Sequence, residues 1–153
     1  YTIINRGFGG SALTDLIGYA DDIIFPYQPK QIVIYCGEND FASSDTISSN
    51  TVYQRFKTLF SIIRNKFPKV SVAYVSMKPS PIRRHLMSKM VLANNMIKGY
   101  LTSKKSTYFI DVFPEMLDKN GNPINNIFLQ DSLHMNADGY KIWQRIIQPY
   151  LLK

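Results

Sequence analysis

Residues 31–40 read Gln-Ile-Val-Ile-Tyr-Cys-Gly-Glu-Asn-Asp, and the predicted architecture follows from them. The run from Gln31 to Cys36 is apolar on both faces, which is typical of a strand in a covered parallel sheet. A glycine then ends the strand, and Asn39 and Asp40 follow at once. Because sites in open parallel sheets form outside the carboxyl ends of the strands, these residues predict both a parallel sheet and a polar site beside it.

Other short runs rich in β-branched and aromatic residues are similar to this strand; they are Tyr1–Asn5, Val70–Ser76 and Thr107–Val112. Apolar residues at three- and four-residue steps predict helices over residues 12–24, from Thr51 to Phe67, from Leu86 to Leu101, and after Asn136. Strands that alternate with helices imply right-handed crossovers between parallel strands. We therefore predict a three-layer α/β/α sandwich with a mainly parallel sheet, formed as one domain by residues 1–153.

The composition indicates a globular protein, because 45% of the 153 residues are hydrophobic and 13% are aromatic. No apolar run approaches the roughly 20 residues that a membrane-spanning helix needs, so we expect no membrane span. The net charge of +7 comes from scattered basic residues, with tight clusters only at Arg83-Arg84-His85 and Lys104-Lys105. Because no basic stripe is interleaved with aromatic residues, we expect no nucleic-acid partner and attribute the charge mainly to solubility.

Neither a metal nor an organic cofactor is predicted. The two histidines are far apart and have no paired acidic or cysteine spacing, which falls short of a metal ligand set. The glycines at positions 7, 9 and 10 do not complete a Gly-x-Gly-x-x-Gly motif, so a dinucleotide site is not expected. The single cysteine, Cys36, excludes an internal disulfide and is expected to be a small buried side chain.

A candidate catalytic pair lies near the end of the chain, where Asp131-Ser132-Leu133-His134 precedes the last helix. An acid three residues before a histidine, on a loop that opens a helix, puts a carboxylate beside an imidazole. The carboxylate can hold the ring in one tautomer and stabilise its charged form. A general base that acts on a hydroxyl nucleophile has these requirements.

Two turns could supply hydrogen-bond donors to the same site. The glycine-rich turn from Arg6 to Ser11 lets a backbone N–H approach a ligand closely, and the Asn39 side chain offers an N–H as well. Two such donors aimed at one point are what a developing oxyanion needs. Asp40 is expected to bond to backbone groups around its own turn.

Together these stretches resemble the SGNH (GDSL-type) hydrolase family of esterases and acylhydrolases. Asn5 to Gly10 matches the family's second block, Gly37 to Asp40 its third block (Gly-x-Asn-Asp), and Asp131 to His134 its fifth block (Asp-x-x-His). The blocks stand in the family's order over essentially the whole chain. The resemblance implies a flavodoxin-like fold and the hydrolysis of esters.

The resemblance also implies a role for each matched residue. His134 would be the general base and Asp131 its orienting acid in a Ser-His-Asp triad, while the Gly10 N–H and the Asn39 side chain would hold the oxyanion. The substrate would be a small-molecule or carbohydrate ester, with acetyl groups on carbohydrate as one class. No cofactor would be required.

The family's nucleophile has no counterpart among the matched residues. Its first block, Gly-Asp-Ser, lies on a strand before the one that begins at Tyr1, and that strand runs between those matched by Tyr1–Asn5 and Gln31–Cys36. We therefore expect these 153 residues to be the C-terminal part of a longer protein, with little activity alone. In the alternatives, a separate N-terminal segment or another copy of the chain fills the gap, or the sheet has rearranged.

Serines within the chain are weaker candidates for the nucleophile. Ser11 is expected to cap the helix that begins beside it, with Thr14 as the alternative cap. Ser76 and Ser80 lie near the carboxyl edge of the sheet, and the side chain of Ser132 should diverge from the imidazole. A second interpretation therefore stays open, in which the chain is a catalytically inactive module that binds a glycan or a protein.

Overall fold

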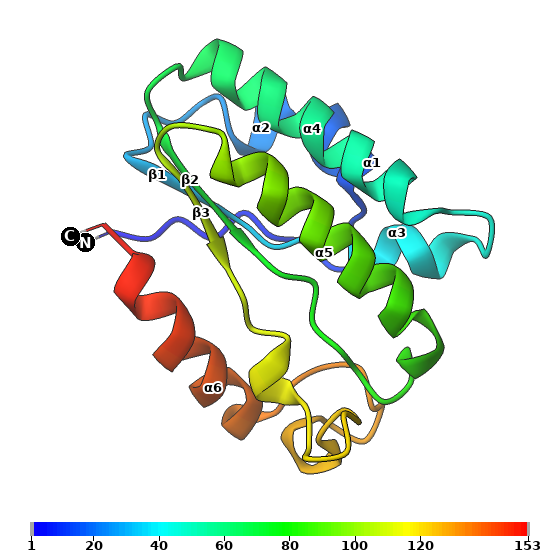
Figure 1. Cartoon of the computed structure of the whole chain (residues 1–153). Coiled ribbons are helices and arrows are strands. Elements are labelled where there is room, and N and C mark those ends of the chain that lie inside the picture. The colour runs from blue at the N-terminus through cyan, green and yellow to red at the C-terminus, as the bar shows by residue number, and fades with distance from the viewer. Residues whose placement is uncertain (1, 153) are drawn as a thin grey trace.

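A parallel sheet lies at the centre of the computed structural model, which describes residues 2–152. The strands are β1 (Gln31–Ile34), β2 (Ser71–Val75) and β3 (Thr107–Ile110), and they lie in the order β1-β2-β3. Both pairings are parallel: Ile34 lies opposite Tyr74, and Tyr74 lies opposite Phe109. The carboxyl ends of these strands therefore meet at one edge of the sheet (Figure 1).

Helices cover both faces of this sheet (Figure 1). They are α1 (Leu13–Gly18), α2 (Ala20–Ile23), α3 (Glu38–Ser43), α4 (Ser49–Lys66), α5 (Met87–Thr102) and α6 (Ala137–Ile147). Short 3₁₀ turns occur at Arg84–Leu86, Pro114–Met116, Asn125–Ile127 and Gln148–Tyr150. In Figure 1, α4 and α5 lie side by side over one face and α6 lies on the other. The predicted three-layer arrangement around a parallel sheet is thereby confirmed.

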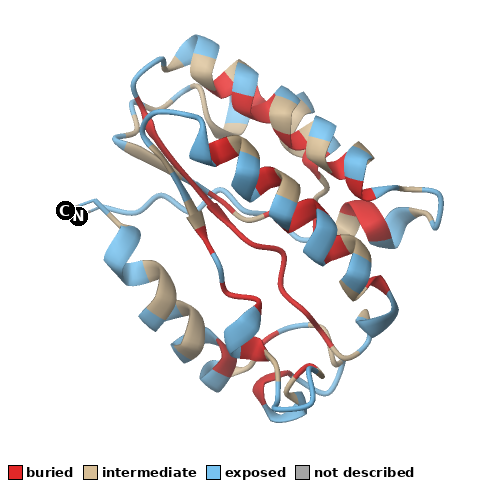
Figure 2. Ribbon diagram, viewed as in Figure 1, coloured by how far each residue is buried: buried red, intermediate tan, exposed pale blue. Residues whose placement is uncertain are grey.

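An apolar core fills each side of the sheet, because successive strand residues point to opposite faces. On one side Tyr74 is fully buried against Phe56 of α4 and Ile97 of α5. On the other side the buried Val75 packs in a cluster that Trp143 of α6 covers. Figure 2 shows buried positions along β2 and continuing past its end. Burial of one large apolar side chain contributes about 1.5–3 kcal/mol to the free energy of unfolding. Because every residue of β2 is buried, this strand is the centre of the fold.

The ends of α4 follow from two local signals. The helix begins at Ser49, earlier than the predicted start at Thr51, because the Ser48 hydroxyl accepts a hydrogen bond from the Thr51 N–H at 3.0 Å. It ends at Lys66, shortly before Pro68, which cannot continue a helix.

The helix predicted over residues 12–24 is divided into α1 and α2. Neither Ser11 nor Thr14 caps α1, so that prediction was wrong. The Asp15 carboxylate, inside the first turn, accepts the Ala12 N–H at 2.8 Å instead. The Ser11 hydroxyl donates to a carbonyl of the preceding turn and does not reach the helix.

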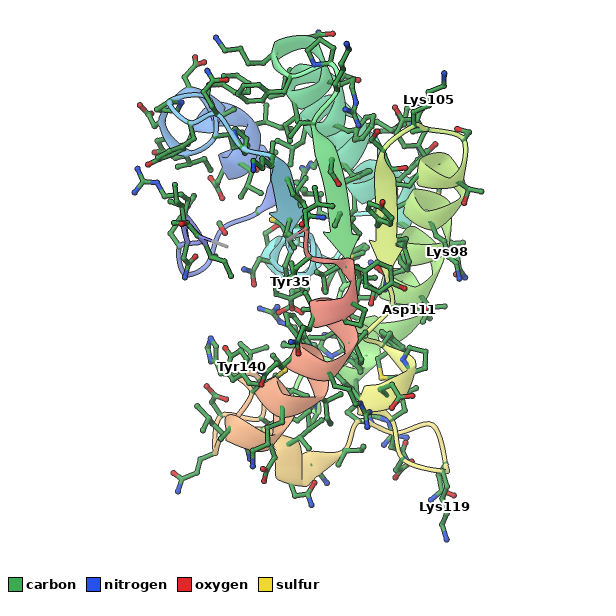
Figure 3. All side chains as sticks on the ribbon, turned by 90° about the vertical axis from the view of Figure 1, so that its left-hand side faces the viewer. Tyr35, Lys98, Lys105, Asp111, Lys119 and Tyr140 are labelled. Carbon is green, nitrogen blue, oxygen red and sulfur yellow. The ribbon has the colours of Figure 1, made fainter. Side chains whose placement is uncertain are left out.

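The strand predicted over Tyr1–Asn5 is not formed by its described residues. Its described part, residues 2–5, pairs with no strand among the described residues, and Ile3 and Ile4 are 70% and 56% exposed; Tyr1 lies outside the described residues. A strand needs a neighbour to pair its backbone groups, and within the described chain β1 pairs only with β2. The segment runs exposed on the β1 side of the sheet (Figures 2 and 3).

Replacing Tyr74 by Phe is expected to lower the free energy of unfolding by about 1–3 kcal/mol. The buried Tyr74 hydroxyl donates to the Cys36 carbonyl at 2.7 Å, and the variant leaves that carbonyl without its partner. Urea unfolding measures the difference. Tyr108→Phe is the control, because Tyr108 lies on neighbouring β3 and is 41% exposed. Equal losses in the two variants would contradict this account.

Candidate active site

The turn after β1 places polar side chains at the carboxyl edge of the sheet. Gly37 has a φ of +132°, and a Cβ there would lie 2.8 Å from the Met77 sulfur, so the turn requires glycine. The chain passes from this turn directly into α3, whose first residues are Glu38, Asn39 and Asp40. Helix α3 was not predicted, because its 6 residues are too few to show helical periodicity.

Asp40 joins three helices through a fully buried carboxylate. Its Oδ2 accepts the Leu13 N–H at the start of α1 at 2.9 Å, and its Oδ1 accepts Arg55 Nη1 of α4 at 2.7 Å. Asp40 was expected to bond backbone groups of its own turn; it bonds the backbone of α1 instead. These contacts fix α1, and with it the glycine-rich turn, relative to α3.

The glycine-rich turn and Asn39 lie against each other. Asn39 Nδ2 donates one hydrogen to the Ser11 carbonyl at 3.0 Å. The preceding residue, Gly10, has a φ of +74°, a left-handed conformation that glycine adopts without strain. Among residues 2–152, no acceptor engages the Gly10 N–H or the second hydrogen of Asn39 Nδ2. Among the described residues, the Gly10 N–H and one N–H of Asn39 are therefore both without an acceptor.

Asp131 and His134 face each other across their loop. Asp131 Oδ2 lies 2.6 Å from His134 Nδ1, and Asp131 Oδ1 accepts the backbone N–H groups of Leu133 and His134, each at 2.9 Å. The bond to the imidazole, followed by these two backbone bonds, lowers the pKa of Asp131 to about 2. Because an ionised carboxylate only accepts hydrogen bonds, Nδ1 carries a hydrogen and Nε2 is left to accept a proton.

Ser132 determines the shape of this loop. Its φ of +57° is left-handed, and its N–H donates to the Leu129 carbonyl at 2.9 Å. Its carbonyl accepts the Ile82 N–H at 3.3 Å, which ties the loop to the segment that follows β2. The next helix is capped by Asn136, whose side chain accepts the Gly139 N–H at 3.2 Å. The Asp131–His134 pair is therefore held between the start of α6 and the segment after β2.

The pair stands at an open surface. The side chains of His134 and Asp131 are 69% and 46% exposed. Two hollows on the surface lie elsewhere, one between Lys141 and Leu151 and one between Pro29 and Val70. The imidazole side chain is thus mostly open to solvent.

Within residues 2–152, no serine hydroxyl is hydrogen-bonded to the His134 ring. The Ser11 hydroxyl donates to a carbonyl of its own turn at 3.0 Å. Ser76 is fully buried, and its hydroxyl accepts the Val112 N–H at 3.0 Å beyond the end of β3. Ser80 is fully buried as well.

A buried polar cluster beside Asn39 was missed at the level of sequence. Glu38 accepts the Tyr35 hydroxyl at 2.7 Å and Lys78 Nζ at 3.2 Å. Arg83 Nη1 lies 3.2 Å from the Glu38 carboxylate, and Arg83 Nη2 donates to Asn39 Oδ1 at 2.8 Å. Tyr35, Glu38, Lys78 and Arg83 are called the Glu38 cluster below. Figure 3 shows Tyr35 just past β1, near α6.

One signal in the sequence could have revealed this cluster. Lys78 continues the apolar run of β2, and a lysine there needs a buried acid as partner. Arg83, in contrast, belongs to the Arg83-Arg84-His85 run, which has the composition of a solvated surface. The structure exposes Arg84 and His85 but turns the Arg83 side chain inward, where it is 14% exposed.

Burial sets the protonation of two other groups near the site. Burial, followed by the charge of Glu38, raises the pKa of Tyr35 well above its ordinary value, so its hydroxyl is a neutral donor. Burial raises the pKa of Cys36 to about 12, which keeps the thiol protonated at neutral pH. Cys36 is the small buried side chain that the sequence predicted.

Among the described residues, no group of three or more His, Cys, Asp or Glu side chains could share a metal ion. No helix of that same part of the chain is long and apolar enough to cross a membrane.

Several solved structures share the fold of this chain but little of its sequence. A Streptococcus pneumonia protein whose name refers to platelet activating factor has a TM-score of 0.85 and 20% identity, covering 99% of this chain and 73% of that one. A GDSL-like lipase from Bacteroides thetaiotaomicron has a TM-score of 0.81 and 20% identity, covering 96% and 74%. A carbohydrate esterase family 3 protein from Talaromyces cellulolyticus has a TM-score of 0.78 and 15% identity, covering 95% and 68%. At these identities the likeness establishes the fold.

The sequence itself gives the family. No curated protein matches it, but residues 1–142 match the GDSL-like lipase/acylhydrolase family. That match extends over all three blocks around Gly10, Asn39 and His134. The resemblance inferred from those blocks is confirmed, and the chain belongs to the GDSL-like lipase/acylhydrolase family.

Proposed function

We propose that the chain is the C-terminal part of a serine ester hydrolase whose triad is completed by a serine outside these 153 residues. Membership of the GDSL-like family indicates esterase or acylhydrolase activity in general. The observation that carries the finer proposal is the ionised Asp131 against His134 Nδ1, at 2.6 Å. This contact places the ring hydrogen of the neutral imidazole on Nδ1, so that Nε2 is the nitrogen that can take a proton, as a general base requires.

In the proposed reaction, the serine oxygen attacks the ester carbonyl carbon while His134 Nε2 takes the hydroxyl proton. The carbonyl π electrons move to the oxygen, and the oxyanion is held by the Gly10 N–H and the free hydrogen of Asn39 Nδ2. Asp131 stabilises the imidazolium. When the tetrahedral intermediate collapses, His134 gives its proton to the departing alcohol, and an acyl-serine remains. Water, deprotonated by His134, then releases the acid by the same steps.

The edge of β1 supports the proposed source of the serine. Within the described chain β1 pairs with β2 alone, and Val33, in the middle of β1, is 42% exposed. The sequence predicts that both faces of this strand are covered. An exposed apolar side chain in its middle is therefore unusual. A further parallel strand on this edge would pair the open backbone groups of β1. Its carboxyl end would lie at the edge of the sheet that carries Asn39.

For the substrate we propose a small acyl ester, with acetyl esters of carbohydrate as the leading class. A structural neighbour is named a carbohydrate esterase, which supports this choice by analogy of fold. The exposed position of His134, whose side chain is 69% exposed, leaves room for an alcohol part larger than the acyl part.

A second function is favoured by one specific observation, the absence of any serine hydroxyl bonded to the His134 ring among residues 2–152. In this alternative the chain is a catalytically inactive module that binds a glycan or a protein. It would bind an acetylated sugar without turning it over.

A fluorophosphonate that labels activated serines separates these functions. The 153-residue chain alone is expected to gain no mass in an intact-mass spectrum, whereas the protein isolated from its natural source gains one label at a serine outside these residues. A label on Ser11, Ser76, Ser80 or Ser132 of the natural protein would contradict the proposed source of the nucleophile. A natural protein that takes no label would favour the binding module.

Replacing Asp131 by Asn in the active protein is expected to lower kcat by about 10²–10⁴, because the amide no longer stabilises the imidazolium or fixes its tautomer. Hydrolysis of 4-nitrophenyl acetate measures the loss. Asp118→Asn is the matched control, since the Asp118 carboxylate also accepts two backbone N–H groups in an exposed turn and lies outside the proposed triad. An equal effect of the two substitutions would argue against the triad.

The Asp131 carboxylate is expected to titrate near pH 2 in carbon NMR spectra. Because its pKa in the folded chain lies below its ordinary value of 3.8, the stabilisation is present above about pH 4 and is lost as the pH falls toward 2. In His134→Ala the pKa should rise, since its largest cause is gone, but should stay below 3.8 because the two backbone N–H groups remain. A titration unchanged by this substitution would contradict the assignment.

A further inference from the structure

Arg83 is the only charged side chain bonded to Asn39 in the part of the chain that the structure describes. Its Nη2 donates to Asn39 Oδ1 at 2.8 Å, and its side chain is 14% exposed. On the other side of the amide, Asn39 Nδ2 donates to the Ser11 carbonyl at 3.0 Å. Asn39 is therefore held at both ends of its amide, by a cation on the oxygen and by a carbonyl on the nitrogen.

This pair of contacts fixes which way the amide faces. A guanidinium can only donate and a carbonyl can only accept. Rotation of the amide by 180° would therefore place the Nδ2 donor against the Arg83 donor and the Oδ1 acceptor against the Ser11 carbonyl. The cation also draws electrons toward Oδ1, which makes the N–H groups better donors. Since one hydrogen of Nδ2 goes to Ser11, the other has no acceptor among residues 2–152 and can donate to an oxyanion.

The Glu38 carboxylate in turn holds Arg83 within the Glu38 cluster. The Glu38 carboxylate lies 3.2 Å from Arg83 Nη1, an ion pair and not a hydrogen bond, because that nitrogen has no hydrogen-bond partner. The same carboxylate accepts hydrogen bonds from the Tyr35 hydroxyl at 2.7 Å and from Lys78 Nζ at 3.2 Å. Tyr35 itself packs edge-on against Trp143 of α6, with ring centroids 4.7 Å apart. Arg83 is thus paired with a carboxylate that also bonds Tyr35, and Tyr35 connects the end of β1 to α6.

The need to neutralise the Glu38 carboxylate does not explain why the Arg83 side chain is turned inward. Lys78 already pairs with that carboxylate and is more deeply buried, with a side chain 6% exposed. Among the described residues, the contact that no other side chain supplies is the one to Asn39 Oδ1. The neighbouring residue, Ile82, bonds Ser132 in the loop of His134, so the same short segment contacts both halves of the site.

We infer that Arg83 is a positioning residue of the oxyanion hole, which acts by orienting and polarising the Asn39 amide. The inference rests on the proposed ester hydrolysis and extends it to a side chain outside the triad and the oxyanion donors. Arg83 itself touches no reacting atom. Its contribution passes through Asn39 and must vanish when that side chain is removed.

A double-mutant cycle in the active protein tests this dependence. Arg83→Met, which keeps the apolar stem and removes every donor, is expected to lower kcat for 4-nitrophenyl acetate about tenfold, with KM changed by less than about twofold. Asn39→Ala should lower kcat by about 10²–10³. In the Asn39→Ala background, Arg83→Met should have no further effect on kcat. Arg83→Lys, which keeps one donor, should recover part of the loss, and Arg84→Met is the exposed control that changes nothing.

Several results would overturn the inference, and they differ from those that overturn the proposed function. If Arg83→Met lowers kcat equally with and without the Asn39 side chain, Arg83 acts elsewhere, and the esterase mechanism stands. If Asn39→Ala keeps full activity, the oxyanion role fails and the inference fails with it. A readout independent of catalysis is the side-chain amide of Asn39 in nitrogen-15 NMR, whose resonances should shift in Arg83→Met and not in Arg84→Met. Unshifted resonances would refute the contact itself.

Discussion

The buried carboxylate of Asp40 is the contact on which the rest of the site depends. It sits without solvent exposure between the first N–H of α1 and Arg55 of α4. A buried charge is tolerated only when it is paired and hydrogen-bonded, and losing one partner of such a pair costs about 3–5 kcal/mol. This requirement forces α1 and α3 into one relative position. Gly10 lies just before α1, and Asn39 lies in the first turn of α3. Fixing these two helices therefore also fixes Gly10 relative to Asn39.

The fold was predictable because its strongest signals are local and periodic. The strand from Gln31 and the end of α4 carry their own boundaries, in a glycine and a proline, whereas the start of α4 was placed two residues too late because the Ser48 cap was not recognised. The contact between Asp131 and His134 was equally readable, since three residues on a tight loop allow few separations. The strand expected at Tyr1–Asn5 failed because strand pairing is a property of two segments, and composition describes only one of them.

The remainder of the site was not readable because its contacts span long stretches of sequence. Arg83 reaches Asn39 across 44 positions, and no local pattern distinguishes it from Arg84 beside it. What separates the two is a short 3₁₀ turn that directs one side chain toward the Glu38 cluster and the other toward solvent. Lys78 was the one visible indication, because a lysine in an apolar run requires an acid nearby. A buried lysine can be located from the sequence, because it interrupts an apolar run, but the residues that pair with it cannot.

The hydrogen bonds of Gln31 have a practical consequence. This residue opens β1, and its side-chain amide accepts the Leu152 N–H at 3.1 Å and donates to the Tyr150 carbonyl at 2.9 Å. The last described turn of the chain is thereby fastened at the amino end of the sheet. Asn39 and His134 follow the opposite ends of the strands. A surface anchor, fluorophore or fusion partner attached at Leu152 would therefore stand at the end of the strands opposite to Asn39 and His134, and immobilised protein would keep the candidate site facing solution.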